Sequence, residues 1–458
     1  MYLALALFLA TYVLLLLFGK YRAYIAAASA LLFVVLGILP WAEVPAAIDW
    51  NVLLMIAGTM GTVVLFIESR MPALMADIIM EKVPNIKWAV VALSLFAGLI
   101  SAFVDNVATV LMVAPVALAL AKKLDISPVP VIIAIAVSSN LQGAATLVGD
   151  TTSILLGGYA DMNFLDFFVF RGRPGIFWVV QVGAVASACV LLYYFRNLRQ
   201  PVESGERTQV TDTVPTLLLV STVTLLIIVS FVPEKPAVTN GVICVLLAAV
   251  GFLRKAGQRR SLAPLGQFFR ELDGQTLLLL ASLFVIIAGI TRAGVIDAIS
   301  RLFVNIAGDD LFAIYSLIVW ASVLFSAFID NIPYVATMLP VVSGIAALMG
   351  VEPYLLYFGL LTGATLGGNL TPIGASANIT GIGILRKEGY TVSNRDFMKI
   401  GVPFSLIAVT TGYLLIWFLW RCAAAEEFKK KRPPAPCLRG GRPFDSQKIR
   451  FYCGCLPM

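Results

Sequence analysis

A short phrase occurs twice in this sequence, each time inside a long apolar stretch. The first copy reads Ser-Ala-Phe-Val-Asp-Asn at 101–106, and the second reads Ser-Ala-Phe-Ile-Asp-Asn at 326–331. The two Asp residues of these phrases, at 105 and 330, lie 225 positions apart, and a proline follows each on the same register, at 115 and 340. A repeat of this length predicts a chain made of two equivalent halves, each with a carboxylate at the same place.

A second pair of phrases follows the first. Residues 138–153 read Ser-Ser-Asn-Leu-Gln-Gly-Ala-Ala-Thr-Leu-Val-Gly-Asp-Thr-Thr-Ser, and residues 367–380 read Gly-Gly-Asn-Leu-Thr-Pro-Ile-Gly-Ala-Ser-Ala-Asn-Ile-Thr. Glycine- and proline-broken segments at matching places in two halves are typical of transporter binding sites. Carboxylates at membrane depth are costly and are rarely present without a function. The four phrases therefore predict movement of ions or small solutes across a bilayer.

The composition fits a chain that lies in lipid. Of 458 residues, 60% are hydrophobic and only 13% are charged, which is too few charges to cover a soluble protein of this size. The formal net charge of +7 indicates membrane orientation rather than nucleic-acid binding. The sequence contains no His, which excludes His proton relays, His metal ligands and Ser-His or Cys-His nucleophile pairs. We expect a multi-pass protein of the inner cell membrane, with the lipid bilayer as its partner and no nucleic acid.

The predicted fold class is an all-α polytopic membrane protein of two inverted repeats. It has about ten spanning helices, two re-entrant hairpins and two unwound helices. The hairpins are predicted at 86–121 and 310–348, and the interrupted helices at 128–158 and 353–385. Short amphipathic elbows are predicted at 71–83 and 295–306. Uninterrupted apolar runs of spanning length cover 2–18, 23–40, 50–67, 174–195, 214–232, 237–253, 275–291 and 400–420.

The domain organisation follows the repeat. The first repeat is 1–196, with scaffold helices in 1–85 and a transport part in 86–196. A cytoplasmic linker, 197–213, precedes the second repeat. That repeat is 214–420, with scaffold helices in 214–309 and a transport part in 310–420. The basic, Pro/Gly-rich tail 421–458 is predicted to be disordered.

Loop charges support opposite orientations of the two halves. Lys20 and Arg22 predict a cytoplasmic first loop, the acidic loop with Glu43 and Asp49 an external one, and the basic loop 254–270 a cytoplasmic one. With each hairpin counted as no net crossing of the membrane, every internal loop obeys the positive-inside rule. The N-terminal end of the first half then lies outside the cell, and that of the second half lies inside. The basic tail is the exception, since the same count places it outside.

The tip carboxylates have two interpretations. An Asp at a hairpin tip can cap the next helix by accepting from its first amides. It can also bind a cation or a proton, because a cap alone needs only Ser or Asn. Asp105, Asp330 and Asp150 are assigned to membrane depth, and no Lys or Arg lies within the four phrases. The predicted empty site is therefore net negative, which favours cation binding.

Together, the four phrases resemble the motifs of the ion transporter superfamily. This group includes citrate-transporter-like permeases, arsenite permeases, NhaD-type sodium/proton antiporters, the P-protein group and divalent anion/sodium symporters. The resemblance covers about residues 1–420. It implies a scaffold domain, a mobile transport domain that holds both hairpins, elevator-type alternating access, and a homodimer formed through the scaffold.

The resemblance also implies the site residues. The binding positions fall on the hairpin tips and unwound segments: Asp105, Asn106, Thr109, Asn140, Thr146 and Asp150, then Asp330, Asn331, Asn369, Thr371, Ser376 and Asn378. A Na⁺ ion is expected at Asp105, Asn140, Asp330 and Asn369. The tips read Asp-Asn where dicarboxylate symporters carry Ser-Asn-Thr. Residues 149–153 read Gly-Asp-Thr-Thr-Ser, where the first unwound segment commonly has Gly-Asp/Ser-Pro-Pro-Asn. The tips are more similar to the antiporter and P-protein branches.

The predicted function is secondary-active transport, not enzymatic catalysis. A citrate-transporter-like permease would move a small ion, carboxylate or oxyanion, coupled to Na⁺ or H⁺, and would need no cofactor beyond that ion. The alternatives within this class are a sodium/proton antiporter and an arsenite-type oxyanion efflux permease. From another class, a passive ion channel would also place re-entrant segments in two inverted halves.

Overall fold

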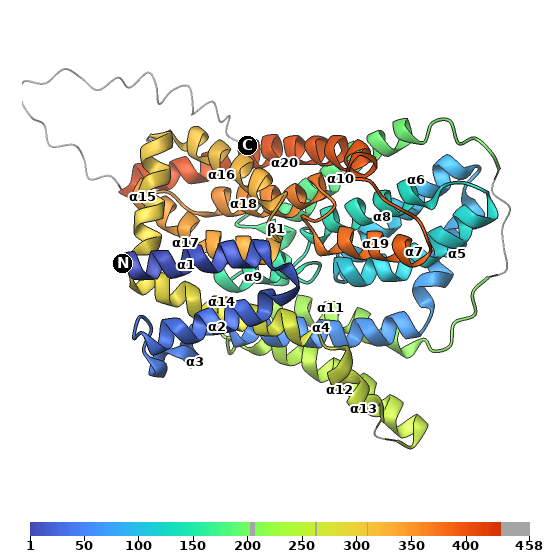
Figure 1. Cartoon of the computed structure of the whole chain (residues 1–458), viewed down its shortest axis with the longest axis horizontal. Helices are drawn as coiled ribbons and strands as arrows, with labels where there is room; N and C mark the ends of the chain where they lie inside the picture. Colours follow the sequence, from blue (N-terminus) through green and yellow to red (C-terminus); the bar gives the residue numbers. More distant parts are fainter. Residues whose placement is uncertain (202–206, 262, 309, 432–458) are drawn as a thin grey trace, which may run out of the picture.

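The computed structural model of the chain describes residues 1–201, 207–261, 263–308 and 310–431. Within these ranges the chain is almost entirely helical (Figure 1), and the described strands are a single antiparallel pair, β1 (Val169–Phe170) and β2 (Arg173–Pro174). The last helix, α20 (Asn394–Lys431), runs past residue 421, so the expected start of the disordered tail lies inside a helix. The rest of that predicted tail, 432–458, lies outside the described residues.

The helices form two matching series. In the first half they are α1 (Tyr2–Leu17), α2 (Arg22–Val35), α3 (Val44–Ala47), α4 (Trp50–Glu68), α5 (Met71–Lys82), α6 (Ile86–Ser101), α7 (Asn106–Lys123), α8 (Pro128–Gly143), α9 (Thr151–Tyr159) and α10 (Ile176–Tyr194). In the second half they are α11 (Val214–Ser230), α12 (Thr239–Arg259), α13 (Ala263–Glu271), α14 (Gly274–Arg292), α15 (Val295–Ala307), α16 (Leu311–Ser326), α17 (Asn331–Met349), α18 (Tyr354–Gly367), α19 (Ser376–Lys387) and α20. Short 3₁₀ turns join some of them, at Gly19–Tyr21, Trp41–Glu43, Phe164–Phe167 and Gly368–Leu370.

The two series keep the 225-residue spacing of the sequence repeat. Helices α6, α7 and α9 begin at 86, 106 and 151, and helices α16, α17 and α19 begin at 311, 331 and 376. Packing between the halves is reciprocal: α4 packs on α12, and α2 packs on α14. Reciprocal contacts of this kind follow from a two-fold relation between two equivalent units. The architecture is that of the two inverted repeats predicted from the sequence.

The predicted hairpins, breaks and elbows all have a structural counterpart. Helices α6–α7 and α16–α17 are the hairpin arms, and α5 and α15 match the two elbows. The helix pairs α8–α9 and α18–α19 are each interrupted where the Gly- and Thr-rich phrases lie. In Figure 1 these broken helices lie between the layer of α4, α12 and α14 and the layer of α10, α16 and α20. The first break is buried throughout, whereas the second reaches the surface at Ile373, which is 62% exposed.

The described residues hold slightly fewer candidate spans than the roughly ten expected. In the described residues seven helices are long and apolar enough to cross a membrane, namely α4, α7, α10, α12, α14, α17 and α20, and the number rises to nine if two bent pairs each count as one span. One bent pair is α1 with the segment Gly19–Val35, which meet at 112°. The 14 residues of α2 extend only about 21 Å, less than the ~30 Å hydrocarbon core. The expectation of two separate spans at 2–18 and 23–40 is therefore wrong.

Matched glycines allow each break to pack against the hairpin of its own half. A Cβ atom added to Gly149 would lie 2.6 Å from the carbonyl oxygen of Gly143, and one added to Gly374 would lie 2.6 Å from that of Gly368. In both halves the next nearest atoms are carbonyl oxygens of the preceding hairpin turn, at 2.8–2.9 Å. Backbone atoms this close leave no room for a side chain at either position.

Threonine hydroxyls fasten the same junctions. Thr146 donates to the carbonyl of Ala102, and Thr371 donates to that of Ala327, so the two halves make the same bond 225 positions apart. A helix break inside a membrane frees carbonyls that need donors, because lipid supplies none. Each hairpin tip is thus tied to the unwound segment that follows it.

Replacing either matched glycine tests this packing. We expect Gly149→Ala and Gly374→Ala each to lower the free energy of unfolding by about 1–3 kcal/mol, because the new methyl group meets backbone carbonyls that cannot move aside. The measurement is thermal unfolding of the purified protein in detergent.

Gly383, inside α19, serves as the control, since a Cβ atom there meets nothing within 4 Å. Gly383→Ala should leave stability unchanged or raise it by roughly 0.5–1 kcal/mol through helix propensity. Equal melting temperatures for all three variants would contradict the close approach at the breaks.

Candidate functional site

Each tip Asp caps the second arm of its hairpin. Asp105 Oδ1 accepts from the amides of Val107 at 2.9 Å and Ala108 at 3.2 Å, and Asp330 Oδ1 accepts from the amide of Ile332 at 3.1 Å. The predicted helix caps are therefore present at both tips. In both caps only Oδ1 is used, so the second carboxylate oxygen remains for another partner. Capping and cation binding are compatible at these tips.

Buried asparagines connect the first hairpin tip to both broken helices. Asn106 Nδ2 donates to Asn140 Oδ1 at 2.9 Å. Asn140 Nδ2 in turn donates to the carbonyl of Thr365 at 2.7 Å and to Asn369 Oδ1 at 3.0 Å, and Asn369 Nδ2 donates to the carbonyl of Val137 at 2.9 Å. All three asparagines are buried. Helices α8 and α18, from different halves, are thus joined by side-chain amides.

The third carboxylate extends this network to the second hairpin. Asp150 Oδ2 accepts from Thr152 Oγ1 at 2.8 Å and from Asn331 Nδ2 at 3.3 Å. The hydroxyls of Thr152 and Thr365 lie 3.3 Å apart, which closes the path back to Asn140. One buried polar chain therefore runs from the Asn of the first tip to the equivalent Asn of the second. Its two ends, at 106 and 331, are related by the repeat.

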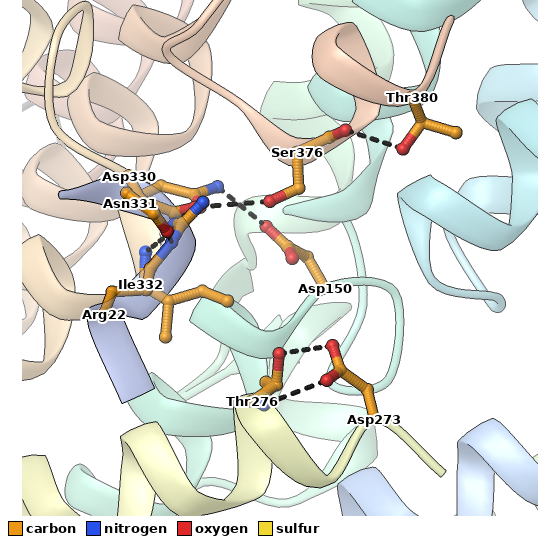
Figure 2. Close-up of polar contacts among 10 residues, drawn as sticks. Arg22, Asp150, Asp273, Thr276, Asp330, Asn331, Ile332, Ser376 and Thr380 are labelled. Carbon is orange, nitrogen blue, oxygen red and sulfur yellow. Dashed lines mark hydrogen bonds and ion pairs between the residues drawn. The ribbon is translucent and has the colours of Figure 1, made fainter. Parts of the chain in front are cut away.

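An arginine from the N-terminal helices lies against the second tip (Figure 2). Arg22 Nη1 forms an ion pair with Asp330 Oδ2, and Ser376 Oγ donates to the same oxygen at 3.2 Å. The Asp330 side chain is 10% exposed and that of Arg22 is 30% exposed. Arg22, predicted as a cytoplasmic loop charge, thus also pairs with a tip carboxylate. It offsets one of the three carboxylate charges on which the prediction of a net-negative site was based.

The sequence did not indicate this contact. Arg22 and Asp330 are 308 positions apart, and Arg22 lies outside all four repeated phrases. A basic residue after an apolar run is typical of a cytoplasmic loop, so the sequence pattern around Arg22 did not indicate a contact with Asp330.

The other predicted site residues mostly bind backbone. Thr109 Oγ1 lies 3.5 Å from the carbonyl of Val104, at the limit of a hydrogen bond. Asn378 Nδ2 donates to the carbonyls of Gly368 at 3.0 Å and Thr371 at 3.2 Å. Asn378 Oδ1 is buried and has no hydrogen-bond partner among the described residues. With Thr146 and Thr371, these side chains stabilise the unwound segments.

The Na⁺ site expected at Asp105, Asn140, Asp330 and Asn369 stays a prediction. Asn140 and Asn369 are in contact, but the described hydrogen bonds of Asp105 and Asp330 go to other groups. The described part of the chain contains no group of three or more Cys, Asp or Glu side chains arranged for a metal ion. Asp150 is nevertheless within electrostatic range of both tip carboxylates. The structure thus gives two distinct tip environments around a shared polar network.

A fourth carboxylate, Asp273, was not predicted as part of the site. It lies within electrostatic range of Asp105 and caps α14, accepting from the Thr276 amide at 3.0 Å and hydroxyl at 2.6 Å (Figure 2). Its counterpart Asp49 caps α4 in the first half and accepts from the amide of Val52 at 3.0 Å. A search for Asp residues that recur as helix caps in both halves would have found it.

This architecture has relatives among known proteins. A family model described as "Citrate transporter", CitMHS, matches residues 12–356 and 242–450. The chain belongs to the CitMHS family. It is a multi-pass membrane transporter, as the apolar helices and the family together indicate.

Several curated relatives of this CitMHS protein span most of its length. The 46 kDa membrane protein of Mycobacterium leprae is 31% identical over 335 residues, which are 71% of this chain and 76% of that protein. The uncharacterized transporter Rv2684 of Mycobacterium tuberculosis is 29% identical over 427 residues, 90% of this chain and 97% of that protein. The human P protein is 27% identical over 448 residues, covering 81% of this chain but only 54% of the P protein.

Two solved structures share the fold. The YdaH transporter of Alcanivorax borkumensis superposes with a TM-score of 0.59 at 14% identity, covering 82% of this chain and 86% of that one. MtrF of Neisseria gonorrhoeae, described as illuminating a class of antimetabolite efflux pumps, superposes with a TM-score of 0.54 at 13% identity and 83% coverage of each chain. At these identities the likeness extends to the fold alone.

The asparagine network should be a major source of stability. Asn140→Ala removes the acceptor of Asn106 and the donor to Asn369, and each buried polar group left unpaired costs about 1–3 kcal/mol. We therefore expect a loss of at least about 2 kcal/mol in unfolding free energy, measured by denaturation in detergent micelles.

Asn85→Ala provides a matched control. Asn85 caps α6 through one bond, 3.2 Å from the Trp88 amide, and lies outside the network. Its removal should cost only ~1 kcal/mol. The importance of the network would be refuted if the two variants lost the same stability.

Proposed function

We propose that this CitMHS-family protein is a secondary-active transporter that couples the movement of a small ion or anion to Na⁺ or H⁺. The observation that carries the proposal is the buried polar chain between the two hairpin tips, which has three carboxylates on or beside it. Asp105 and Asp330 each keep one carboxylate oxygen outside their helix cap, and Asp150 lies within electrostatic range of both. Asp150 is buried and the two tip carboxylates are partly buried. Holding three carboxylates in such surroundings is costly, and a bound cation would offset their mutual repulsion.

The first tip is our candidate for the main cation site. Within the described residues no Lys or Arg forms an ion pair with Asp105, and the charged neighbours that act on it include Asp273 and Asp150. Carboxylate oxygens together with the carbonyls of an unwound helix suit Na⁺, and the carboxylate alone suits H⁺. A backbone carbonyl near this tip is that of Ala102 in the hairpin turn, which accepts from Thr146.

A sodium/proton antiporter is the second candidate. The excess of carboxylates over the single Arg22 favours a cation rather than an anion as the transported species. Against this stands the family description, which favours citrate or a related carboxylate. Gradient-driven arsenite flux would identify an arsenite-type oxyanion efflux permease, and flux that does not saturate would identify a passive channel.

The remaining parts of the proposal concern assembly and movement. We propose that the transport parts, 86–196 and 310–420, move as an elevator against a scaffold that pairs two copies of the chain. We also propose residence in the inner cell membrane and no cofactor other than the coupling ion. These statements rest on the resemblance to the ion transporter superfamily and on the two hairpins and broken helices of the fold.

A flux screen in proteoliposomes tests the function. Na⁺ and pH gradients are imposed separately, and uptake of citrate, dicarboxylates, arsenite and ²²Na⁺ is followed. Gradient-driven accumulation of a carboxylate supports the main proposal, whereas Na⁺ flux driven by a pH gradient without any anion supports the antiporter. Flux that does not saturate and shows no counterflow identifies a channel.

The role of the first tip is tested by Asp105→Asn. The amide oxygen keeps the helix cap, since Asn caps about as well as Asp, while the charge is removed. We expect the variant to fold and to insert into the membrane. The Na⁺ or H⁺ concentration that gives half-maximal flux should rise by about tenfold or more.

Asp310→Asn is the matched control, because Asp310 caps α16 through the amide of Phe312 at 2.9 Å and is exposed. It should transport as the unmodified protein does. Unchanged cation dependence in Asp105→Asn would show that the carboxylate is structural only.

A further inference from the structure

The N-terminal helices make two separate contacts with the second hairpin. Arg22, at the start of α2, pairs with Asp330. From α1, the Tyr12 hydroxyl donates to the carbonyl of Pro333 at 2.7 Å and also hydrogen-bonds the hydroxyl of Thr337. All three of these partners lie at the tip of the hairpin or in the first two turns of α17. The bent α1–α2 pair therefore holds the tip from two sides.

The two tips differ in charge although their backbones match. Asp105 has acidic neighbours, Asp150 and Asp273, and no basic ion-pair partner within the described ranges. Asp330 carries the same helix cap, but its other oxygen is occupied by a guanidinium. The repeat thus places one open carboxylate and one neutralised carboxylate at equivalent positions.

The atom that Arg22 occupies is the one that a cation would need. Asp330 Oδ1 is used by the cap, while Oδ2 receives both Arg22 Nη1 and Ser376 Oγ. An arginine does not lose its proton in a protein, so its charge at this oxygen is permanent. A monovalent cation can therefore reach Asp330 Oδ2 only if the guanidinium leaves.

We propose that Arg22 is a displaceable counter-ion of Asp330, which a transported or coupling monocation replaces, so that cation binding releases the second hairpin from α1–α2. This inference rests on the proposed function and assigns a role to a residue outside the repeated motifs. Arg22 acts as a positioning residue, since it sets the cation affinity of Asp330 and joins the tip to helices of the predicted scaffold. The empty protein is held by the ion pair, and the loaded protein is free to move its hairpin.

The proposal predicts competition. Arg22→Gln removes the competing charge but leaves Asp330 and its cap in place. We expect the half-saturating cation concentration for flux to fall by about tenfold or more, because close charge pairs are commonly coupled by at least this factor. Cation-dependent thermal stabilisation of the purified protein should shift to lower concentration by the same factor.

Two arms identify the competing ion. One titrates Na⁺ at fixed pH, and the other titrates pH at fixed Na⁺. If H⁺ is the ion, half-saturation in Arg22→Gln moves to higher pH. Within the described residues, charged groups that face Asp330 include Arg22 from α2 and Asp150 from the break before α9, whereas its neighbours Ser376 and Asn331 are uncharged.

A double-mutant cycle assigns the effect to the pair. In the background of Asp330→Asn, adding Arg22→Gln should produce no further shift in half-saturation. Arg292→Gln is the control, because Arg292 forms an exposed ion pair with Glu43 and has no described contact with either tip. It should behave as the unmodified protein does.

The outcomes separate this inference from the proposed function. If the unmodified protein shows no dependence on Na⁺ or pH, the proposed function fails and this inference fails with it. If the unmodified protein depends on the cation but Arg22→Gln leaves half-saturation unchanged or raised, only the counter-ion role is overturned. If Arg22→Gln does not accumulate in the membrane, Arg22→Lys is measured instead. Its ammonium group binds the carboxylate less well than the planar guanidinium, so a smaller fall in the half-saturating cation concentration is expected. An unchanged or raised half-saturating concentration in Arg22→Lys would refute the role.

Discussion

The structure depends on satisfying the polar groups that two broken helices free inside a membrane. Lipid offers no hydrogen bonds, so each break must be supplied with partners by the protein itself. Thr146 and Thr371 supply donors to the hairpin turns, and Asn378 supplies donors to two carbonyls of the second break. The breaks are thus compatible with the bilayer because the hairpins pack against them. The same hydrogen bonds hold the hairpins in position.

The repeated phrases predicted this core well because they are local. The helix bounds at both tips and both breaks, and the matched positions of Gly149 and Gly374, follow from residues within a few turns of one another. Features that depend on contacts between distant segments were missed. Arg22 looked like an ordinary loop charge, and the short α1–α2 pair looked like two spans, because apolar length and loop charge do not reveal a bend or a partner 308 positions away.

The candidate site was predicted in part for a related reason. Asn140 and Asn369 do meet, as the motifs suggested, but their amides bind each other and backbone carbonyls. Side-chain amides have both donors and acceptors, so they satisfy one another, whereas carboxylates only accept and need a donor or a cation. The asparagines therefore join the two halves, and the charge of the site lies on the carboxylates, of which Asp330 is paired with Arg22.

The two halves share a backbone but not their charges. Position 150 in the first half carries Asp and its counterpart in the second half, 375, carries Ala. Arg22 pairs with Asp330, the tip of the second half, and that half has no carboxylate at the position equivalent to Asp150. Two-fold related cation sites would be equivalent if their charges were equal, and they would then fill together. Unequal charges separate the affinities of the two tips. Under the proposed function, the acidic first tip is the one to bind a cation first, and the second binds only after its arginine withdraws.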